Sequence, residues 1–325
     1  MRPPEHWHLR RRPRRRPWPL IALLGTVLVG VAFAVLWCRP DGGGPAKVNV
    51  SPPICSVALE CTPTVPSPSY GSDAPPPAVR GLAATVIEAS CGAPLYEKNA
   101  CAQLPPASLT KMMTALIVVQ RDDLARVVDV QVNGALMVAS SGASIMGLEP
   151  GMRLSLQDLM YGMLLPSGND AAAELALDVA GTELDFVALM NQEARRIGLR
   201  GTHFSNPSGL DQAGLYTTAR DMALLVRAYM QAPELAAIAG TTSYQPDWDR
   251  GEVLNGNELL ERYPGALGVK TGYTELAGQT IVASAERNGR TLIASILGSY
   301  DRYADAIALF DWAFTSTHPA CGPIP

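Results

Sequence analysis

Apolar and polar positions repeat with two different periods along residues 80–318. A period of two predicts strands, and a period of three to four predicts helices. The predicted strands cover residues 83–89, 95–97, 126–132, 269–274, 279–285 and 291–298. The predicted helices begin at Ser108 and then cover residues 155–164, 170–179, 183–197, 217–230 and 304–314. Strands near both ends with helices between them predict one domain, whose sheet is built from both ends of the sequence.

A different pattern precedes this domain. Residues 20–37 contain no charged side chain, and an uncharged segment of this length can cross a bilayer. Seven of the 26 basic residues, but only one of the 30 acidic residues, fall in the first sixteen positions. Because basic flanks stay in the cytoplasm, we expect a cytoplasmic tail (1–17), a membrane anchor (18–38) and a body on the cell-wall side of the cytoplasmic membrane. A cleaved signal peptide, which would release a secreted form, is the alternative.

Composition separates the anchor from the domain. Ten of the 41 residues from 39 to 79 are proline, which predicts a semi-extended linker, and residues 319–325 form a short tail. The net charge of −4 conceals a strongly acidic body behind the basic N-terminus. An acidic body does not fit a nucleic-acid partner, so we expect none.

The six cysteines fit an exported protein with disulfides. Cys91 and Cys101 flank a predicted hairpin and could form a disulfide, as could Cys55 and Cys61 in the linker. Cys38 and Cys321 have no obvious partner. Since no cysteine–histidine cluster has zinc-ligand spacing, we expect neither a metal site nor another cofactor.

The first candidate site is the segment PPASLTK at residues 105–111. The prolines predict that a helix begins close to Ser108, and three-residue spacing then places Ser108 and Lys111 on one face. A serine needs an adjacent base to act as a nucleophile, and a buried lysine can lose its proton and serve as one. Only four of the 26 basic residues are lysine, and arginine could not play this part. The alternative is a helix-capping serine beside a solvated lysine.

Two further motifs follow in the chain. The sequence LPSGND (165–170) lies between two predicted helices, so Ser167 and Asn169 can project from a loop. There the hydroxyl could relay protons and the amide could orient a substrate and Lys111, or the two residues could merely cap the next helix. The sequence GVKTGYT (268–274) is a predicted strand that carries Lys270 and Thr271, which could hold a carboxylate. A glycine at 272 lets another backbone come close. An ordinary edge strand with a solvated lysine is the alternative.

The three motifs, in this order, resemble those of the serine D-alanyl-D-alanine carboxypeptidases, the low-molecular-mass penicillin-binding proteins. The resemblance covers residues 80 to about 317 and includes the segments PPASLTKMMTA, SGNDAAA, FVALMNQEA, NPSGLD, TTARDMALL and PGALGVKTGYTELAG. It implies the penicilloyl-serine transferase fold, an α+β arrangement of an antiparallel sheet flanked by helices with a helical subdomain.

The resemblance also implies a role for each motif residue. Ser108 would be the nucleophile, Lys111 its general base, and Ser167 with Asn169 the middle wall of the site. Lys270 and Thr271 would bind a terminal carboxylate, Gly272 would let the substrate lie against the strand, and the N–H groups of Ser108 and Tyr273 would form the oxyanion hole. The implied partners are peptidoglycan stem peptides ending in D-Ala-D-Ala, and β-lactam antibiotics.

Several alternatives remain open from the sequence. The same motifs fit a D,D-endopeptidase that cuts crosslinks, a β-lactamase, or a β-lactam-binding sensor that is acylated without turnover. A β-lactamase needs a deacylating base, and residues 202–215 offer only Asp211. Members of this family often have histidine where Ser208 stands, and this difference is expected to affect the rate of deacylation. A Ser-His-Asp triad would have to use His203, the only histidine in the predicted domain before its C-terminal end, and is disfavoured.

Overall fold

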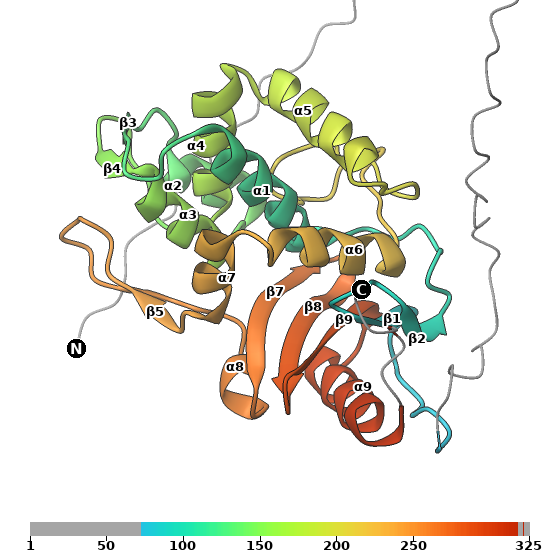
Figure 1. The fold of residues 1–325 in the computed structure, drawn as a ribbon. Helices are drawn as coiled ribbons and strands as arrows, with labels where there is room; N and C mark the ends of the chain where they lie inside the picture. Colours follow the sequence, from blue (N-terminus) through green and yellow to red (C-terminus); the bar gives the residue numbers. More distant parts are fainter. Residues whose placement is uncertain (1–72, 318–320, 322–325) are drawn as a thin grey trace, which may run out of the picture. The chain divides into compact units, whose positions relative to one another are not determined.

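The computed structural model describes residues 73–317 and Cys321 (Figure 1). Its main feature is a five-stranded antiparallel sheet in the order β2-β1-β9-β8-β7. The strands are β1 (Ala83–Glu88), β2 (Pro94–Lys98), β7 (Ala266–Thr274), β8 (Gly278–Arg287) and β9 (Arg290–Ser299). Because β1 pairs directly with β9, the sheet is built from both ends of the domain, as predicted.

Both faces of this sheet are covered. On one face, α9 (Arg302–Ser316) and α8 (Leu259–Arg262) pack on side chains such as Val86 and Ile281. On the other face, Ala83 and Ile87 of β1 join the core of the helical region. All six residues of β1 are therefore buried, which explains why this strand is apolar almost without interruption.

The helical region surrounds α1 (Lys111–Arg121), whose residues 111–118 are all buried. A helix that is apolar on every side belongs at the centre of a bundle. The neighbours of α1 include α3 (Leu156–Leu164), α4 (Asn169–Ala180), α5 (Glu183–Arg196), α6 (Ala219–Tyr229) and α7 (Pro233–Gly240). The remaining elements are α2 (Gly134–Ser141) and two small sheets, β3 (Val127–Asp129) with β4 (Arg153–Ser155) and β5 (Ser243–Tyr244) with β6 (Val253–Leu254).

Most predicted elements lie within a few residues of their observed bounds, since capping side chains mark the helix starts. Ser155 caps α3 in a capping box with Asp158, and Thr182 caps α5. The strand predicted at residues 126–132 is too long, because the N–H groups of Gln131 and Val132 bind the Glu174 carboxylate instead of a neighbouring strand. The short elements α2, α7, α8 and β4–β6 were not predicted, and α2 is exposed apart from Gly134 and the half-buried Met137, so it lacks a regular buried stripe.

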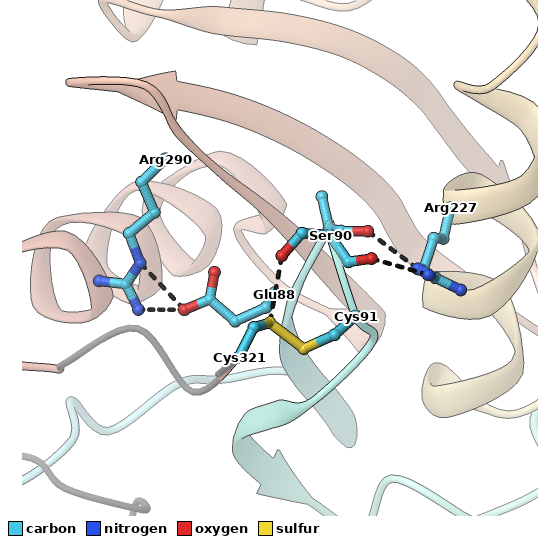
Figure 2. The surroundings of a disulfide bond; sticks show 7 residues. Glu88, Ser90, Cys91, Arg227, Arg290 and Cys321 are labelled. Atoms are coloured by element: carbon cyan, nitrogen blue, oxygen red, sulfur yellow. Dashed lines mark hydrogen bonds and ion pairs between the residues drawn. A yellow bond between two sulfur atoms is a disulfide. The ribbon is translucent and has the colours of Figure 1, made fainter. Parts of the chain in front are cut away.

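The possible disulfide between Cys91 and Cys101 is not formed, because Cys91 is bonded to Cys321 (Figure 2). Cys91 precedes β2 and Cys101 follows it, and a five-residue strand spans about 17 Å, well beyond disulfide reach. Cys101 is also disulfide-bonded. Cys38, Cys55 and Cys61 lie outside the described residues, and so does the possible disulfide between Cys55 and Cys61.

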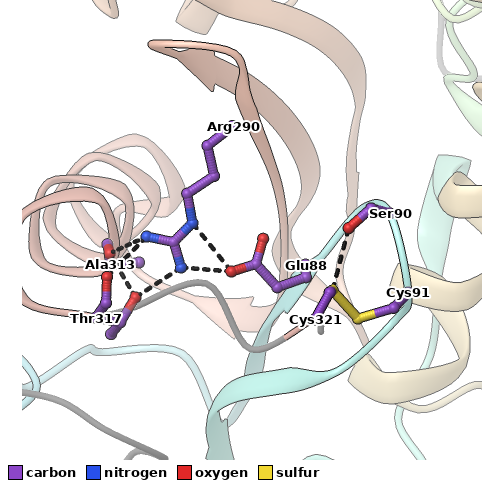
Figure 3. A network of polar contacts seen from close by, with 7 residues as sticks. All are labelled: Glu88, Ser90, Cys91, Arg290, Ala313, Thr317 and Cys321. Atoms are coloured by element: carbon purple, nitrogen blue, oxygen red, sulfur yellow. Dashed lines mark hydrogen bonds and ion pairs between the residues drawn. A yellow bond between two sulfur atoms is a disulfide. The ribbon is translucent and has the colours of Figure 1, made fainter. Parts of the chain in front are cut away.

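Arginines tie the chain together around this disulfide. Arg290 of β9 binds Glu88 of β1 and the carbonyls of Ala313 and Thr317 at the end of α9 (Figure 3). Arg227 of α6 donates to two carbonyls in the β1–β2 turn (Figure 2). These bonds join both faces of the sheet to the end of β1, where the disulfide closes a sequence separation of 230 residues.

The predicted N-terminal segments lie mostly outside the described residues. These include the tail (1–17), the anchor (18–38) and the linker as far as residue 72. The end of the predicted linker contacts the domain, since the indole of Trp312 donates to the Ala74 carbonyl and Val79 is buried. Across residues 73–317, none of the helices combines the length and the apolar character needed to cross a bilayer.

Candidate active site

Ser108 lies at the entrance to the central helix. Pro105 and Pro106 end the preceding segment, a short 3-10 helix, η1 (Ala107–Thr110), follows, and α1 continues from it without a break. Ala107 has a positive φ of 51°, which is strained for a residue with a side chain. This turn leaves Ser108 half-buried at the surface, while Leu109 and Thr110 point into the core.

Lys111 is fully buried one turn further along, and three oxygen atoms surround its amine. The Nζ atom lies 3.0 Å from Ser108 Oγ, 2.7 Å from Asn169 Oδ1 and 2.7 Å from the Ser208 carbonyl. The predicted pairing of Ser108 with Lys111 is therefore present at hydrogen-bond distance. The alternative of a solvated lysine is wrong, because Lys111 has no exposed surface.

The chemistry of the three oxygens determines which partner can receive the lone pair of a neutral amine. Asn169 Nδ2 donates to the Ser144 carbonyl at 2.9 Å, which fixes the amide so that its oxygen faces Lys111. That oxygen and the Ser208 carbonyl can only accept hydrogen bonds. A neutral amine has two N–H donors for these two acceptors. Its lone pair is then left for the hydroxyl of Ser108, the one partner that can donate a proton.

Burial holds the pKa of Lys111 well below its ordinary value, and the neighbouring charge of Lys270 lowers it further. The Asp170 carboxylate acts in the opposite direction. Asp170 is itself buried and accepts hydrogen bonds from the N–H groups of Met146, Gly147 and Leu148, so it mainly anchors the loop between α2 and β4. The surroundings of Lys111 therefore favour its neutral form.

Lys270 is the second buried lysine of the site. It lies on the edge strand β7, is 3% exposed, and donates to the Thr271 carbonyl at 3.0 Å. Burial, together with the charge of Arg302, lowers the pKa of Lys270 to about 7. The prediction of an edge strand is correct, but the lysine is not solvated. Two buried amines close enough to influence each other avoid carrying two charges at once.

Gly272 brings β7 against the start of η1. A Cβ atom at this position would lie 2.6 Å from Thr280 Oγ1, 2.9 Å from the Ser108 nitrogen and 3.0 Å from Ala107 Cβ. The observed reason for glycine is thus the contact with the nucleophile segment, while a contact with substrate stays a prediction. Thr280 Oγ1 also donates to the Pro106 carbonyl, so β8 supports the same turn.

The family model described as D-alanyl-D-alanine carboxypeptidase, Peptidase S11, matches residues 71–301. The chain belongs to this family. DacF of Bacillus subtilis, a D-alanyl-D-alanine carboxypeptidase, is 35% identical over 73% of this chain and 63% of its own length. DacB2 of Mycobacterium tuberculosis, which carries the same description, is 38% identical over 65% of this chain and 74% of its own length.

Solved structures of a D-alanyl-D-alanine carboxypeptidase and of a DD-transpeptidase have the same fold. The D-alanyl-D-alanine carboxypeptidase structure from Mycobacterium tuberculosis superposes with a TM-score of 0.70 at 34% identity, covering 78% of this chain and 98% of the other. The Streptomyces K15 DD-transpeptidase gives a TM-score of 0.71 at 29% identity, over 74% and 99% of the two chains. These superpositions confirm the expected antiparallel sheet flanked by helices. The chain spans only about three fifths of the length of DacF.

The remaining predicted site residues lie in the loop after α3 and on β7. Ser167 lies in the loop between α3 and α4, as predicted, with a positive φ of 66° and a half-buried side chain. Thr271 is half-buried and Tyr273 is 58% exposed, and both follow Lys270 on β7. The suggested roles of Ser167 in proton relay and of the Tyr273 N–H in the oxyanion hole stay predictions.

Arg302 is a site residue that the sequence interpretation missed. Its Nη1 donates to the Gly272 carbonyl at 2.6 Å and to the Thr280 carbonyl at 3.3 Å, and its charge acts on Lys270. Its Nε is buried without a hydrogen-bond partner among the described residues. A signal was present: Arg302 is the first residue of α9, where a positive charge opposes the helix dipole and therefore needs another reason.

The contribution of Ser208 was also not predicted. Its carbonyl binds Lys111, whereas its side chain bonds locally to Asn206 Oδ1 at 3.2 Å. The contact with the proposed base is therefore made by the backbone and is independent of the residue type at position 208. His203 Nδ1 bonds to the Gly214 carbonyl, an exposed structural contact.

Proposed function

We propose that this chain is a serine D-Ala-D-Ala carboxypeptidase that removes the terminal D-alanine from peptidoglycan stem peptides. The observation that carries the proposal is the fully buried Lys111 amine, held by two acceptor-only oxygens and 3.0 Å from Ser108 Oγ. Family membership supports the reaction class. Because the chain covers only part of the length of relatives such as DacF, the activity and the substrate are proposed from the geometry of this site.

In the first step, neutral Lys111 takes the proton of Ser108 while Oγ attacks the carbonyl carbon of the penultimate D-alanine. The developing oxyanion receives hydrogen bonds from the N–H groups of Ser108 and Tyr273, worth roughly 3 kcal/mol each. The C–N bond then breaks, and the leaving D-alanine amine takes the proton back, directly or through Ser167. Water releases the acyl group from Ser108 by the same proton transfers in reverse order.

Substrate orientation is assigned to the end of the site on β7. The terminal carboxylate binds the charged form of Lys270 and the hydroxyl of Thr271. An anion beside Lys270 favours the protonated amine, so carboxylate binding raises a pKa that burial has lowered to about 7. β-Lactams carry a similar carboxylate next to a reactive carbonyl, so they should acylate Ser108 in the same pose.

The experiment that tests this function uses the purified protein and a peptide ending in D-Ala-D-Ala. The expected products are free D-alanine and the shortened peptide, and a Ser108→Ala variant should release none. Crosslinked muropeptide dimers test the endopeptidase alternative, which predicts separated monomers. Release of no product from either substrate would contradict the proposal, whereas labelling by penicillin without turnover would favour the sensor.

The β-lactamase alternative lacks support at Asp211. Both carboxylate oxygens of this residue bind the β7–β8 hairpin, to Thr274 Oγ1 at 2.7 Å and to the Leu276 N–H at 3.2 Å. A carboxylate engaged in this way is a poor candidate for activating a water beside Ser108. Slow hydrolysis of the penicilloyl adduct is therefore expected.

We further propose that the protein is a single-pass membrane protein with its catalytic domain on the cell-wall side. The support is the uncharged segment 20–37 after an arginine-rich tail, followed by the proline-rich linker 39–79. Protease added to intact spheroplasts should digest the domain. Complete protection of the domain would contradict this orientation.

A further inference from the structure

The loop of residues 206–211, which we call the NPSGLD loop, contacts three parts of the site. The Pro207 carbonyl accepts a hydrogen bond from Thr114 of α1 at 2.7 Å, and the Ser208 carbonyl accepts one from Lys111. Gly209 has a positive φ, and a Cβ there would lie 1.9 Å from the Ala107 carbonyl. The loop therefore rests directly on the residue before Ser108 and on the proposed base.

Asn206 makes the NPSGLD loop rigid. Its Oδ1 accepts from the N–H groups of Ser208 at 3.1 Å and Gly209 at 2.6 Å, and its Nδ2 donates to the Leu210 carbonyl at 2.9 Å. Asn206 is 5% exposed. Bonds of this kind fix the backbone of a loop that has no regular secondary structure. The side chain of Asn206 thus links the part of the loop that contacts Lys111 to the part that leads to Asp211.

Asp211 ends the loop and reaches the last residue of β7 and the turn that follows it. Its carboxylate accepts from Thr274 Oγ1 and from the Leu276 N–H, while Thr274 Oγ1 itself accepts from the Ala277 N–H. These residues directly follow the β7 segment with Lys270 and Tyr273. The two bonds are the polar bridge by which the NPSGLD loop holds this hairpin, and β7 is the edge strand of its sheet.

We propose that Asp211 is a positioning residue for acylation. Through the NPSGLD loop on one side and Thr274 on the other, it sets the spacing between Ser108 and the β7 segment that carries the proposed oxyanion donor. This inference rests on the proposed function. It assigns the bridge to the acylation step rather than to substrate affinity, because Lys270 and Thr271 lie on β7 itself and keep their mutual geometry when the bridge is lost.

The test measures acylation by a fluorescent penicillin, separating the noncovalent dissociation constant from the acylation rate constant, for variants of both bridge residues. Asp211→Ala and Thr274→Val should each slow acylation about tenfold, with little change in the dissociation constant. This loss is smaller than the roughly 100-fold loss of rate that a 1 Å displacement of reacting groups can cause. The double variant should be little slower than the slower single variant, since both single variants break the same bond between Asp211 and Thr274. Thr274→Ser keeps the hydroxyl and should restore most of the rate.

Asp249→Ala removes an exposed carboxylate from the β5–β6 hairpin and serves as the matched control, with an unchanged rate expected. Melting temperatures should differ little among all variants, because the bridge is exposed. Three results would overturn the inference while leaving the proposed function intact. They are a wild-type acylation rate in Asp211→Ala, additive losses of rate in the double variant, and a Thr274→Ser variant as slow as Thr274→Val. A wild-type protein that penicillin does not label would overturn both.

Discussion

Replacing Gly272 by alanine tests the contact between β7 and the nucleophile segment. The added Cβ would lie 2.6 Å from Thr280 Oγ1, 2.9 Å from the Ser108 nitrogen and 3.0 Å from Ala107 Cβ. Carbon contacts of this kind prefer about 3.5–4.0 Å, so η1 and β7 must separate by roughly 0.5–1 Å. Displacement of reacting groups by about 1 Å can cost 100-fold in rate, so we expect acylation of Ser108 to fall by about two orders of magnitude.

The same substitution should leave the protein folded. Overpacking costs about 1–3 kcal/mol, and for a domain of this size each kcal/mol lowers the melting temperature by about 2–4 °C. Penicillin labelling and thermal unfolding therefore measure separate consequences.

Gly256→Ala is the matched control, because its Cβ would meet nothing closer than the Leu165 carbonyl at 3.8 Å. It should acylate at the wild-type rate. Wild-type acylation by the Gly272→Ala variant would refute the reasoning, since the approach of β7 to Ser108 would then have no bearing on the reaction.

Three further predictions concern charge, recognition and the disulfide. For a carboxylate substrate, kcat/KM should fall as pH rises through about 7, where Lys270 loses its proton, and Lys270→Arg should abolish this alkaline decline because arginine stays charged. An amidated D-Ala-D-Ala peptide should lose most reactivity, and equal rates for acid and amide would contradict the carboxylate assignment. Replacing Cys91 and Cys321 together by serine should destabilise the domain by about 2–4 kcal/mol in denaturant titrations without slowing acylation; an equally stable variant would show that the bridge constrains nothing.

Sequence patterns predicted the parts of this site that depend on side chains at fixed local spacing. Ser108 and Lys111 are three residues apart on one helix, so local geometry brings them together. Asn169, which the pattern LPSGND placed in a loop or at a helix cap, is the first residue of α4, and its oxygen reaches the same amine. The α+β architecture followed from strands at both ends of the domain, and the pairing of β1 with β9 realises it.

Contacts that depend on backbone atoms or on distant register were not predictable in this way. The Ser208 carbonyl reaches Lys111 across 97 positions, and no side-chain pattern identifies a carbonyl as a partner. Arg302 reaches the Gly272 carbonyl only because β7 and β8 pair in one particular register beside the start of α9. Cys321 meets Cys91 because the chain returns to β1 after α9, which local hairpin spacing could not indicate.

The central claim is that neutral Lys111 accepts the proton of Ser108. Its most direct test compares penicillin acylation rates of Lys111→Arg and Lys111→Ala, with circular dichroism to verify the fold of each. Arginine keeps the charge but cannot act as a base, so both variants should lose a factor on the order of 10² to 10⁴ and should differ little from each other. A Lys111→Arg variant that is acylated at close to the wild-type rate, beside an inactive Lys111→Ala, would show that the residue supplies only charge and that the base is another group.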